Sequence, residues 1–544
     1  MAEAGIKRWA MIAIGLLVLG AYLAHVAAYG PQINDDAFIT FRYSKFLVLG
    51  RGPYFNVGEQ VEGYTNFLMM LLMAGAIVLF GDDEVLFVAK VIGVAGGLAA
   101  IVAAWALCAR WLRKIEALAP HADLLAGAAA ALAATNCAYA FNSTTGLETT
   151  LFSAWVVLGL WLLQKGYDAQ RYRGAGIAFA LAALTRPEGG MIFAAAFLGR
   201  LIAAEWRTKT GRHALALDAL IVGAVVVGHL VFRYAFYDGE LLPNTFYAKR
   251  GGFTWQVTAA EYVLGFGVVL MGAVVPIFAL FPILPRNHGV RRSTLPALLA
   301  VWASVAAIFI AGAGWMPGFR LLIPYVPVWS ALAVRGIAAV ADRFRSYGVH
   351  VAVVTSLLLV GVLFFWQQSE RGEYYNYGRI RAAGYITGHA ALADWLNERA
   401  EPGAAVALMD IGIVGFKCID LHILDITGLT DRYIAKSPGG FLTKEFDPAY
   451  VFDQKPEFLI IAAQGPAGRI GDEEMDQLQP WTVVESRLMM DDAFHTYYVH
   501  RRGFDREAPE LERLAAVFGA ERVFRHDYPD KNYLLFAHTY RGPQ

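Results

Sequence analysis

The chain has 544 residues, of which 57% are hydrophobic, and its mean hydropathy is +0.44. The 46 basic and 46 acidic residues balance, and no basic stripe is visible, which argues against nucleic acid as a partner. Cys108, Cys137 and Cys418 are too few and too scattered for a disulfide framework or a zinc site. Because the apolar residues come in long uncharged runs, the composition predicts a polytopic α-helical membrane protein.

Apolar runs of about 20 residues predict membrane-spanning helices. The first run, Trp9 to Ala28, follows the basic pair Lys7 and Arg8, so we expect a retained first span with a cytoplasmic N-terminus. The candidate spans are 9–29, 85–109, 123–141, 149–164, 174–186, 189–204, 214–236, 257–283, 296–312, 321–341 and 348–366.

The short apolar stretch 67–80 decides the topology. If it does not span, five basic loops between spans all lie in the cytoplasm, as the positive-inside rule requires. We therefore expect 67–80 to be an interfacial or re-entrant helix, which gives about eleven spans and places the C-terminus outside. The basic loops are Arg110/Arg113/Lys114, Lys165/Arg171/Arg173, Arg207/Lys209/Arg212, Arg286/Arg291/Arg292 and Arg343/Arg345.

The same rule divides residues 174–204 into two short helices at Thr185–Gly189, with Arg186 and Glu188 at the turn. Charge and non-helical backbone at that depth are tolerated where they line a cavity or are buried in protein. With this topology, the unusual polar clusters all lie on the outer side. They are the first loop (residues 30–66), 144–148, 185–189, 242–250 and 314–320.

The composition changes near residue 370, which predicts a transmembrane domain over 1–369 and an extracytoplasmic α/β domain over 370–544. Helical periodicity runs from about 380 to 400. Short apolar runs then predict strands at Val406–Met409, Ile423–Ile426, Phe458–Ala462, Thr482–Val484, Tyr497–His500 and Tyr533–Ala537.

Asp35 and Asp36 follow the first span and open an amphipathic segment. One interpretation is helix capping, with Asn34 or Asp35 as the N-cap and Asp36 favoured in the first turn. The other is catalytic, since a carboxylate beside the membrane could take a proton from an acceptor hydroxyl. The doublet alone leaves both open.

Other polar residues on the outer side form three candidate groups. A group rich in carboxylates and aromatic rings could line a sugar or acceptor site. Acids at outer turns are functional candidates, although an ion pair of Glu188 with Arg186 or Arg320 is the structural alternative. Outer cations suit an anionic ligand such as phosphate, although some could be membrane-surface anchors. The sugar or acceptor group is Glu59, Glu62, Tyr64, Glu148, Glu188, Asn244, Tyr247 and Trp315, and the phosphate group is Arg42, Arg186, Lys249 and Arg320.

The first loop resembles that of GT-C membrane glycosyltransferases, and most closely the branch of the mycobacterial arabinofuranosyltransferase AftB and its Gram-negative relatives. The resemblance covers roughly residues 10–370 and continues into the C-terminal part. The residues that carry it are Asp35-Asp36, Arg42, Gly50-Arg51-Gly52-Pro53, Phe55-Asn56-x-Gly58-Glu59-x-Val61-Glu62, Thr145-Gly146-Leu147-Glu148, Thr185-Arg186-Pro187-Glu188, Leu242-Pro243-Asn244-Thr245, Trp315-Met316-Pro317-Gly318-x-Arg320, Asp410-Ile411-Gly412 and Asp425-x-x-Gly428-Leu429-x-Asp431.

The resemblance implies a polyprenyl-phosphate sugar donor, often the arabinofuranosyl lipid, and inverting transfer to a glycan, lipid or protein acceptor outside a bacterial inner membrane. It also implies that Asp35 or Asp36 is the base, with the four outer cations binding the leaving phosphate. No cofactor is required by the sequence. A divalent metal, Mg²⁺ or Mn²⁺, on Asp35, Asp36 and Glu148 is left open.

Three alternatives remain at this point. A transporter or flippase for lipid-linked sugars would also need broken helices and buried charge. A non-catalytic assembly protein would use its C-terminal domain to bind cell-wall glycan. The GT-C fold could also carry another donor, with a hexose or an aminopentose.

Overall fold

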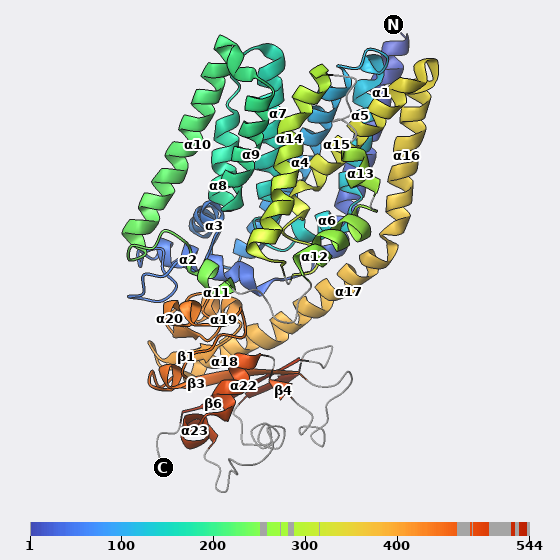
Figure 1. Ribbon diagram of the computed structural model, residues 1–544. Helices are drawn as coiled ribbons and strands as arrows, with labels where there is room; N and C mark the ends of the chain where they lie inside the picture. The colour runs from blue at the N-terminus through green and yellow to red at the C-terminus, as the bar shows by residue number, and fades with distance from the viewer. Residues whose placement is uncertain are drawn as a thin grey trace.

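The structure is a computed structural model that describes residues 2–250, 258–272, 274–280, 288–314, 316–464, 479–480, 482–499, 524–527 and 533–540. It consists of a helical bundle with a mixed α/β domain at one end (Figure 1). Helix α1 begins at the opposite end of the bundle from this domain (Figure 1).

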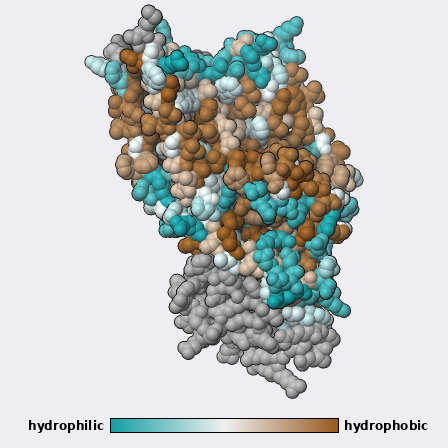
Figure 2. Space-filling view, turned by 180° about the vertical axis from the view of Figure 1, so that it is seen from behind, coloured by the Kyte–Doolittle hydropathy of each residue, from teal (hydrophilic) through white to brown (hydrophobic). Residues whose placement is uncertain are grey.

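The bundle consists of long helices that run side by side (Figure 1). Figure 2 shows hydrophobic residues covering its side and hydrophilic residues gathered towards its ends. The helices are α1 (Ala2–Tyr29), α4 (Val85–Leu112), α5 (Ala122–Ala134), α6 (Cys137–Ser143), α7 (Thr149–Ala169), α8 (Ala175–Thr185), α9 (Glu188–Ile202), α10 (Lys209–Phe236), α12 (Ala259–Gly265), α13 (Val274–Leu280), α14 (His288–Ala311), α15 (Val326–Ala341) and α16 (Gly348–Trp366).

The chain is a multi-pass membrane protein by the length and apolarity of these helices. Among the described residues, six helices are long and apolar enough to cross a membrane, or up to eight if the bent pairs α5–α6 and α12–α13 each count as one span. Every predicted span coincides with a helix or a bent pair, but α7, α8 and α9 fall short of that criterion. The number of eleven spans therefore stays a prediction.

Two predictions about short helices agree with the structure. Helix α3 (Phe67–Phe80) is seen almost end-on in Figure 1 while the bundle helices run up the page, so it lies across them. Helix α8 ends at Thr185 and α9 begins at Glu188. The two pack closely, because a Cβ added at Gly189 would lie 2.5 Å from the backbone of Ala182.

Further short helices close the end of the bundle that faces the α/β domain: α2 (Asp35–Val48) in the first loop and α11 (Asn244–Lys249). Helix α17 (Gln368–Gly384) leads from α16 to the domain. It continues through a π-helical turn at Tyr385–Ala390 into α18 (Ala391–Arg399), as the periodicity predicted.

The C-terminal domain is built on a mixed sheet with the strand order β2-β1-β3-β6-β5, and β4 pairs with β3. Strands β1, β2 and β3 are parallel, and β6 is antiparallel to β3 and β5. The strands are β1 (Ala405–Leu408), β2 (His422–Asp425), β3 (Phe458–Gln464), β4 (Gln479–Pro480), β5 (Phe524–Asp527) and β6 (Tyr533–Thr539), and the helices are α19 (Ile411–Lys417), α20 (Arg432–Lys436), α21 (Ala449–Phe452), α22 (Val483–Met490) and α23 (Asp492–Phe494).

Two strand predictions were wrong. Thr482–Val484 starts α22, because the Thr482 side chain and Glu485 form a capping box. In the run Tyr497–His500, residues up to Val499 belong to a π-helical turn, and the Tyr498 ring packs on Phe494. His500 lies outside the described residues.

The C-terminal domain shares a hydrophobic core with the membrane part. Ile39, Tyr43 and Phe55 of the first loop pack in one cluster with Val414 of α19 and Leu408 of β1. The opposite face of the sheet is covered by a separate cluster that includes α21, α22 and α23. Side-chain packing therefore holds the sheet against the first loop, which lies far from it in the sequence.

Candidate active site

A cavity of about 350 Å³ lies where the bundle meets the C-terminal domain. Both parts of the chain contribute walls, so the site belongs to their junction. The bundle side provides Asp35, Asp36, Ile39, Lys249 and Pro317, and the remaining walls come from Tyr377, Arg381, Tyr385, Met409, Asp410, Ile411, Thr427, Leu429, Phe441 and Leu442.

Asp35 and Asp36 stand in the first turn of α2, as the capping interpretation predicted. The Asn34 side chain is the N-cap and accepts a hydrogen bond of 3.0 Å from the backbone nitrogen of Asp36. Capping therefore falls to Asn34, and both aspartates are available for other contacts.

The two aspartates differ in their partners. Asp35 is buried, and its carboxylate accepts hydrogen bonds from the backbone nitrogens of Gly412 (2.9 Å) and Ile413 (2.7 Å) at the start of α19. Asp36 is half-buried and lines the cavity, and within the described residues no side-chain hydrogen bond of its carboxylate is recorded. Asp35 thus joins the two domains, and Asp36 faces the space where a ligand would lie.

The surroundings of Asp36 set its protonation. Burial raises the pKa of Asp36 above the usual value, while Lys249 and Arg320 oppose this rise. Cations close to a half-buried acid form a mixed-charge site at the end of the bundle. The cations suit an anionic ligand, and the acid suits a second ligand whose hydroxyl is deprotonated.

Sequence reasoning missed most of the wall supplied by the C-terminal domain. Asp410 lies in the cavity, and its Oδ2 is 3.0 Å from Nε2 of the buried His389. Arg381 and Tyr385 line the same space. The run Asp410-Ile411-Gly412 had been singled out as part of the resemblance, which was the available signal for Asp410.

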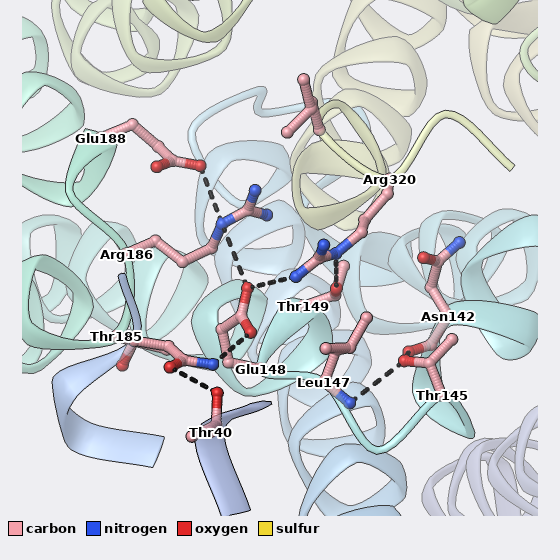
Figure 3. A network of polar contacts seen from close by, with 12 residues as sticks. Thr40, Asn142, Thr145, Leu147, Glu148, Thr149, Thr185, Arg186, Glu188 and Arg320 are labelled. Atoms are coloured by element: carbon pink, nitrogen blue, oxygen red, sulfur yellow. Dashed lines mark hydrogen bonds and ion pairs between the residues drawn. The ribbon is translucent and has the colours of Figure 1, made fainter. Parts of the chain in front are cut away.

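A buried ion network centred on Glu148 supports the bundle side of the site (Figure 3). Glu148 Oε1 accepts from Arg320 Nη2 at 2.9 Å and lies 3.5 Å from Arg186 Nε, while Oε2 accepts from Asn66 at 2.9 Å. Arg186 Nε also lies 2.9 Å from Glu188. The expected ion pair of Glu188 with Arg186 is confirmed, and Glu148, the N-cap residue of α7, contacts both arginines.

One hydrogen-bond donor of this network has no acceptor among the described residues. Arg186 is 6% exposed, and its Nη1 has no hydrogen-bond partner within the described part of the chain. A buried guanidinium nitrogen without an acceptor is costly. It is therefore a candidate contact for an anion.

Arg42, predicted to bind phosphate, lies elsewhere. Its Nε donates to Phe55 O at 2.6 Å, Nη1 donates to Gly415 O and Cys418 O, and Nη2 donates to Leu421 O at 2.9 Å. The side chain is fully buried and ties the first loop to α19. Nη2 also donates to the Asn56 side chain at 3.4 Å, so the protein itself uses every donor nitrogen of Arg42, and the structure corrects the phosphate prediction.

The side chains of four predicted sugar-binding residues likewise bond to other groups of the protein. Glu62 is buried 2.8 Å from Arg233, and the Tyr64 hydroxyl lies 2.9 Å from that of Tyr237. The Asn244 Nδ2 lies 2.9 to 3.2 Å from the carbonyl oxygens of Gly428, Leu429 and Asp431. The Tyr247 hydroxyl donates to Glu240.

Two further sugar-site candidates are Glu59 and Trp315. Glu59 lines a separate outer groove. Trp315 lies outside the described residues. The structure therefore gathers Asp35, Asp36 and Lys249 at the cavity, with Arg186, Arg320, Glu148 and Glu188 in the adjoining network.

The acids do not gather as a metal site. Within the described residues there is no group of three or more His, Cys, Asp or Glu side chains that could hold a metal ion. Asp35 is engaged by backbone N–H groups and Glu148 by Asn66 and Arg320. The proposed ligand set Asp35, Asp36 and Glu148 therefore does not fit a metal ion.

Solved structures define the class of the fold. The chain is similar to ArnT from Cupriavidus metallidurans bound to undecaprenyl phosphate, with a TM-score of 0.51, 14% identity, and coverage of 98% of this chain and 99% of that one. It is also similar to the archaeal oligosaccharyltransferase AglB from Archaeoglobus fulgidus in complex with an inhibitory peptide and a dolichol-phosphate, with a TM-score of 0.52, 12% identity, and coverage of 97% and 89%. The chain has the GT-C fold, which confirms the predicted fold class.

Among curated proteins, the chain is similar to terminal β-(1→2)-arabinofuranosyltransferases, which confirms the predicted resemblance. The protein from Mycobacterium tuberculosis is 31% identical over 239 residues, which is 41% of this chain and 36% of that protein. The protein from Corynebacterium glutamicum is 26% identical over 376 residues, which is 61% of this chain and 52% of that protein. The chain thus spans about a third to a half of the length of these relatives.

A family model also matches the C-terminal part. Residues 376–508 match a domain of unknown function, DUF8728. The match begins within α17 and includes Arg381, Tyr385 and Asp410 of the cavity wall.

Proposed function

We propose that this chain is an inverting glycosyltransferase of a bacterial inner membrane. It transfers a pentofuranosyl unit, such as arabinofuranose, from a polyprenyl phosphate to an acceptor hydroxyl on the extracytoplasmic side. The carrying observation is that the junction cavity is lined by the half-buried carboxylate of Asp36, which accepts no hydrogen bond within the described residues, together with Lys249. The similarity to arabinofuranosyltransferases supports the sugar, and the lipid phosphates named with ArnT and AglB support the donor.

The reaction requires one displacement. The acceptor oxygen attacks the anomeric carbon, Asp36 takes the hydroxyl proton, and the bond from the anomeric carbon to the phosphate oxygen breaks. Its electron pair leaves with the polyprenyl phosphate, so the anomeric configuration inverts. Asp36 is the base because the Asp35 carboxylate is occupied by the backbone of α19 and the Asp410 carboxylate is bonded to His389.

The leaving phosphate needs cations more than a general acid, because it departs as an anion. Lys249 in the cavity wall and the unpartnered Nη1 of Arg186 are the groups available to it, with Arg320 beside them. Glu148 holds Arg186 and Arg320 in position. Glu188 acts through Arg186. The set Asp35, Asp36 and Glu148 does not fit a metal ion, because Asp35 and Glu148 are engaged by other groups, so no step of the proposed reaction is assigned to one.

The test is transfer by the full chain in lipid nanodiscs. The donor is an isotopically labelled polyprenyl-phosphate arabinofuranose, and the acceptors are arabinofuranosyl oligosaccharides, with products read by mass spectrometry. We expect a product one pentose heavier, and a loss of about 10²-fold or more with Asp36→Asn. The transfer rate should be unchanged after treatment with EDTA. Full activity of Asp36→Asn would overturn the base assignment. In proteoliposomes, movement of the labelled lipid across the membrane with no glycan product would instead support a transporter.

A further inference from the structure

A second, larger hollow lies outside the junction cavity. This outer groove has a volume of about 960 Å³ and lies between the first loop and the segment that carries α20 and α21. Its walls include Glu59, Gln60, Asp431, Tyr433, Asp447 and Tyr450. None of these residues lines the junction cavity.

Two tyrosines form an ordered aromatic surface in the outer groove. The rings of Tyr433 and Tyr450 lie 4.2 Å apart between centroids, at an angle of 35°. The Tyr450 hydroxyl donates to Asp431 Oδ2 at 2.8 Å, which fixes the orientation of that ring. Tyr433 is 48% exposed. The exposed ring of Tyr433 therefore packs on the fixed ring of Tyr450, and an exposed aromatic ring suits the apolar C–H face of a sugar.

The charges of the outer groove disfavour an anionic ligand. Both cations of its wall are already paired, since Arg432 lies 2.5 Å from Asp238 and Lys436 is bonded to Glu240. Glu59, Glu445 and Asp447 add negative charge. Carboxylates and the Gln60 amide are suitable partners for the hydroxyl groups of a neutral glycan.

The outer groove and the junction cavity share one wall. Thr427 and Leu429 line the cavity, whereas Thr430 and Asp431 line the groove. This segment is fixed by the Asn244 amide and by Asp425, whose carboxylate accepts from the backbone nitrogens of Thr427 (2.8 Å) and Thr430 (2.7 Å). A ligand in the groove is therefore held at a constant position relative to Asp36.

We propose that the outer groove binds the non-reacting part of a neutral glycan acceptor. This inference rests on the proposed function and assigns the acceptor class that the function leaves open. Binding energy from a remote part of the acceptor places its reactive hydroxyl near the base. Asn244, through the shared wall, is a positioning residue for this arrangement.

The experiment measures binding separately from transfer. Full-length Asp36→Asn protein in nanodiscs is titrated with a fluorescent neutral arabinofuranosyl oligosaccharide, an acidic oligosaccharide and an unstructured peptide. We expect the neutral oligosaccharide to bind, and Tyr433→Ala or the groove-filling Gln60→Trp to weaken it about tenfold. Tyr375→Ala, which removes an exposed ring of α17 outside the groove, is the matched control and should leave binding unchanged.

Each outcome has one meaning. Equal binding by the parent and both groove variants, or preferential binding of the peptide or the acidic glycan, would overturn the inference. If the Tyr433-sensitive binding is present but the protein with Asp36 intact transfers no sugar, the proposed function fails while the glycan groove stands. If transfer is found and the groove variants bind normally, only the groove assignment fails.

Discussion

Asp35 Oδ2 accepts a hydrogen bond of 2.9 Å from the backbone nitrogen of Gly412, a residue 377 positions later in the chain. A Cβ at position 412 would lie 2.0 Å from the backbone oxygen of Asp35. Helices α2 and α19 can approach this closely only because residue 412 has no side chain. The contact brings Asp410 into the same cavity as Asp36.

Gly412→Val should therefore separate the C-terminal domain from the first loop. We expect transfer to fall by about 10²-fold, because a displacement of the order of 1 Å in a site can cost that much. The helical content should stay unchanged. Gly372→Val is the control, since a Cβ there meets nothing within 4 Å. Transfer rate and proteolytic accessibility of the C-terminal domain measure the effect, and a fully active Gly412→Val protein would contradict the proposed docking contact.

The two aspartates should respond differently to removal of their charge. Asp36→Asn should lower the transfer rate by about 10²-fold or more with an unchanged melting temperature. Asp35→Asn should lower stability by about 1–3 kcal/mol, because an amide N–H would then face a backbone N–H of α19. Thermal unfolding and transfer rate, measured on the same samples, separate the two. The reverse pattern would make Asp35 the base.

The pH profile should report the raised pKa of Asp36. A base works in its ionised form, so kcat/KM rises with pH through the pKa of Asp36. Burial raises this pKa, so the acid limb should lie above the ordinary aspartate value of about 4. Lys249→Gln removes a cation that lowers the pKa of Asp36, so it should move the limb further towards neutral pH. A limb at the ordinary value, or a shift to lower pH in the variant, would contradict this assignment.

Arg42 should matter for stability and not for donor affinity. Arg42→Ala leaves several buried carbonyl oxygens without a donor, and we expect a loss of about 2–4 kcal/mol. Arg42→Lys should recover part of this, since an ammonium group cannot reproduce the planar set of donors. The folded fraction of either variant should keep the parent's KM for the lipid donor. If an Arg42 variant had normal stability and a raised KM for the lipid donor, Arg42 would be a phosphate ligand after all.

The parts of the fold that were predictable are those fixed by local composition. Apolar runs located each helix of the bundle, and the charges around Arg186 located the break between α8 and α9. The strand predicted at Thr482–Val484 failed because β-branched residues outweighed a helix signal in the same run. The Thr482 and Glu485 pair is a capping box that the sequence already showed.

The candidate site was predictable in part for a different reason. Asp36 and Lys249 could be found because they stand beside spans, where charge is unusual. Arg42 could not be separated from them, because its partners are carbonyl oxygens of Gly415, Cys418 and Leu421, which no side-chain pattern reveals. Tyr385 and Arg381 enter the site only through the docking of two distant segments.

The core shared by the first loop and α19 also has a consequence for biosynthesis. The first loop emerges early during translation, whereas β1, α19 and β2 emerge only after the last apolar helix of the bundle. Until then, Ile39, Tyr43 and Phe55 lack their packing partners in α19 and β1, and Arg42 lacks its carbonyl acceptors Gly415, Cys418 and Leu421. A nascent chain inserted in the bilayer thus lacks a complete junction cavity, and the site can form only after translation has passed β2.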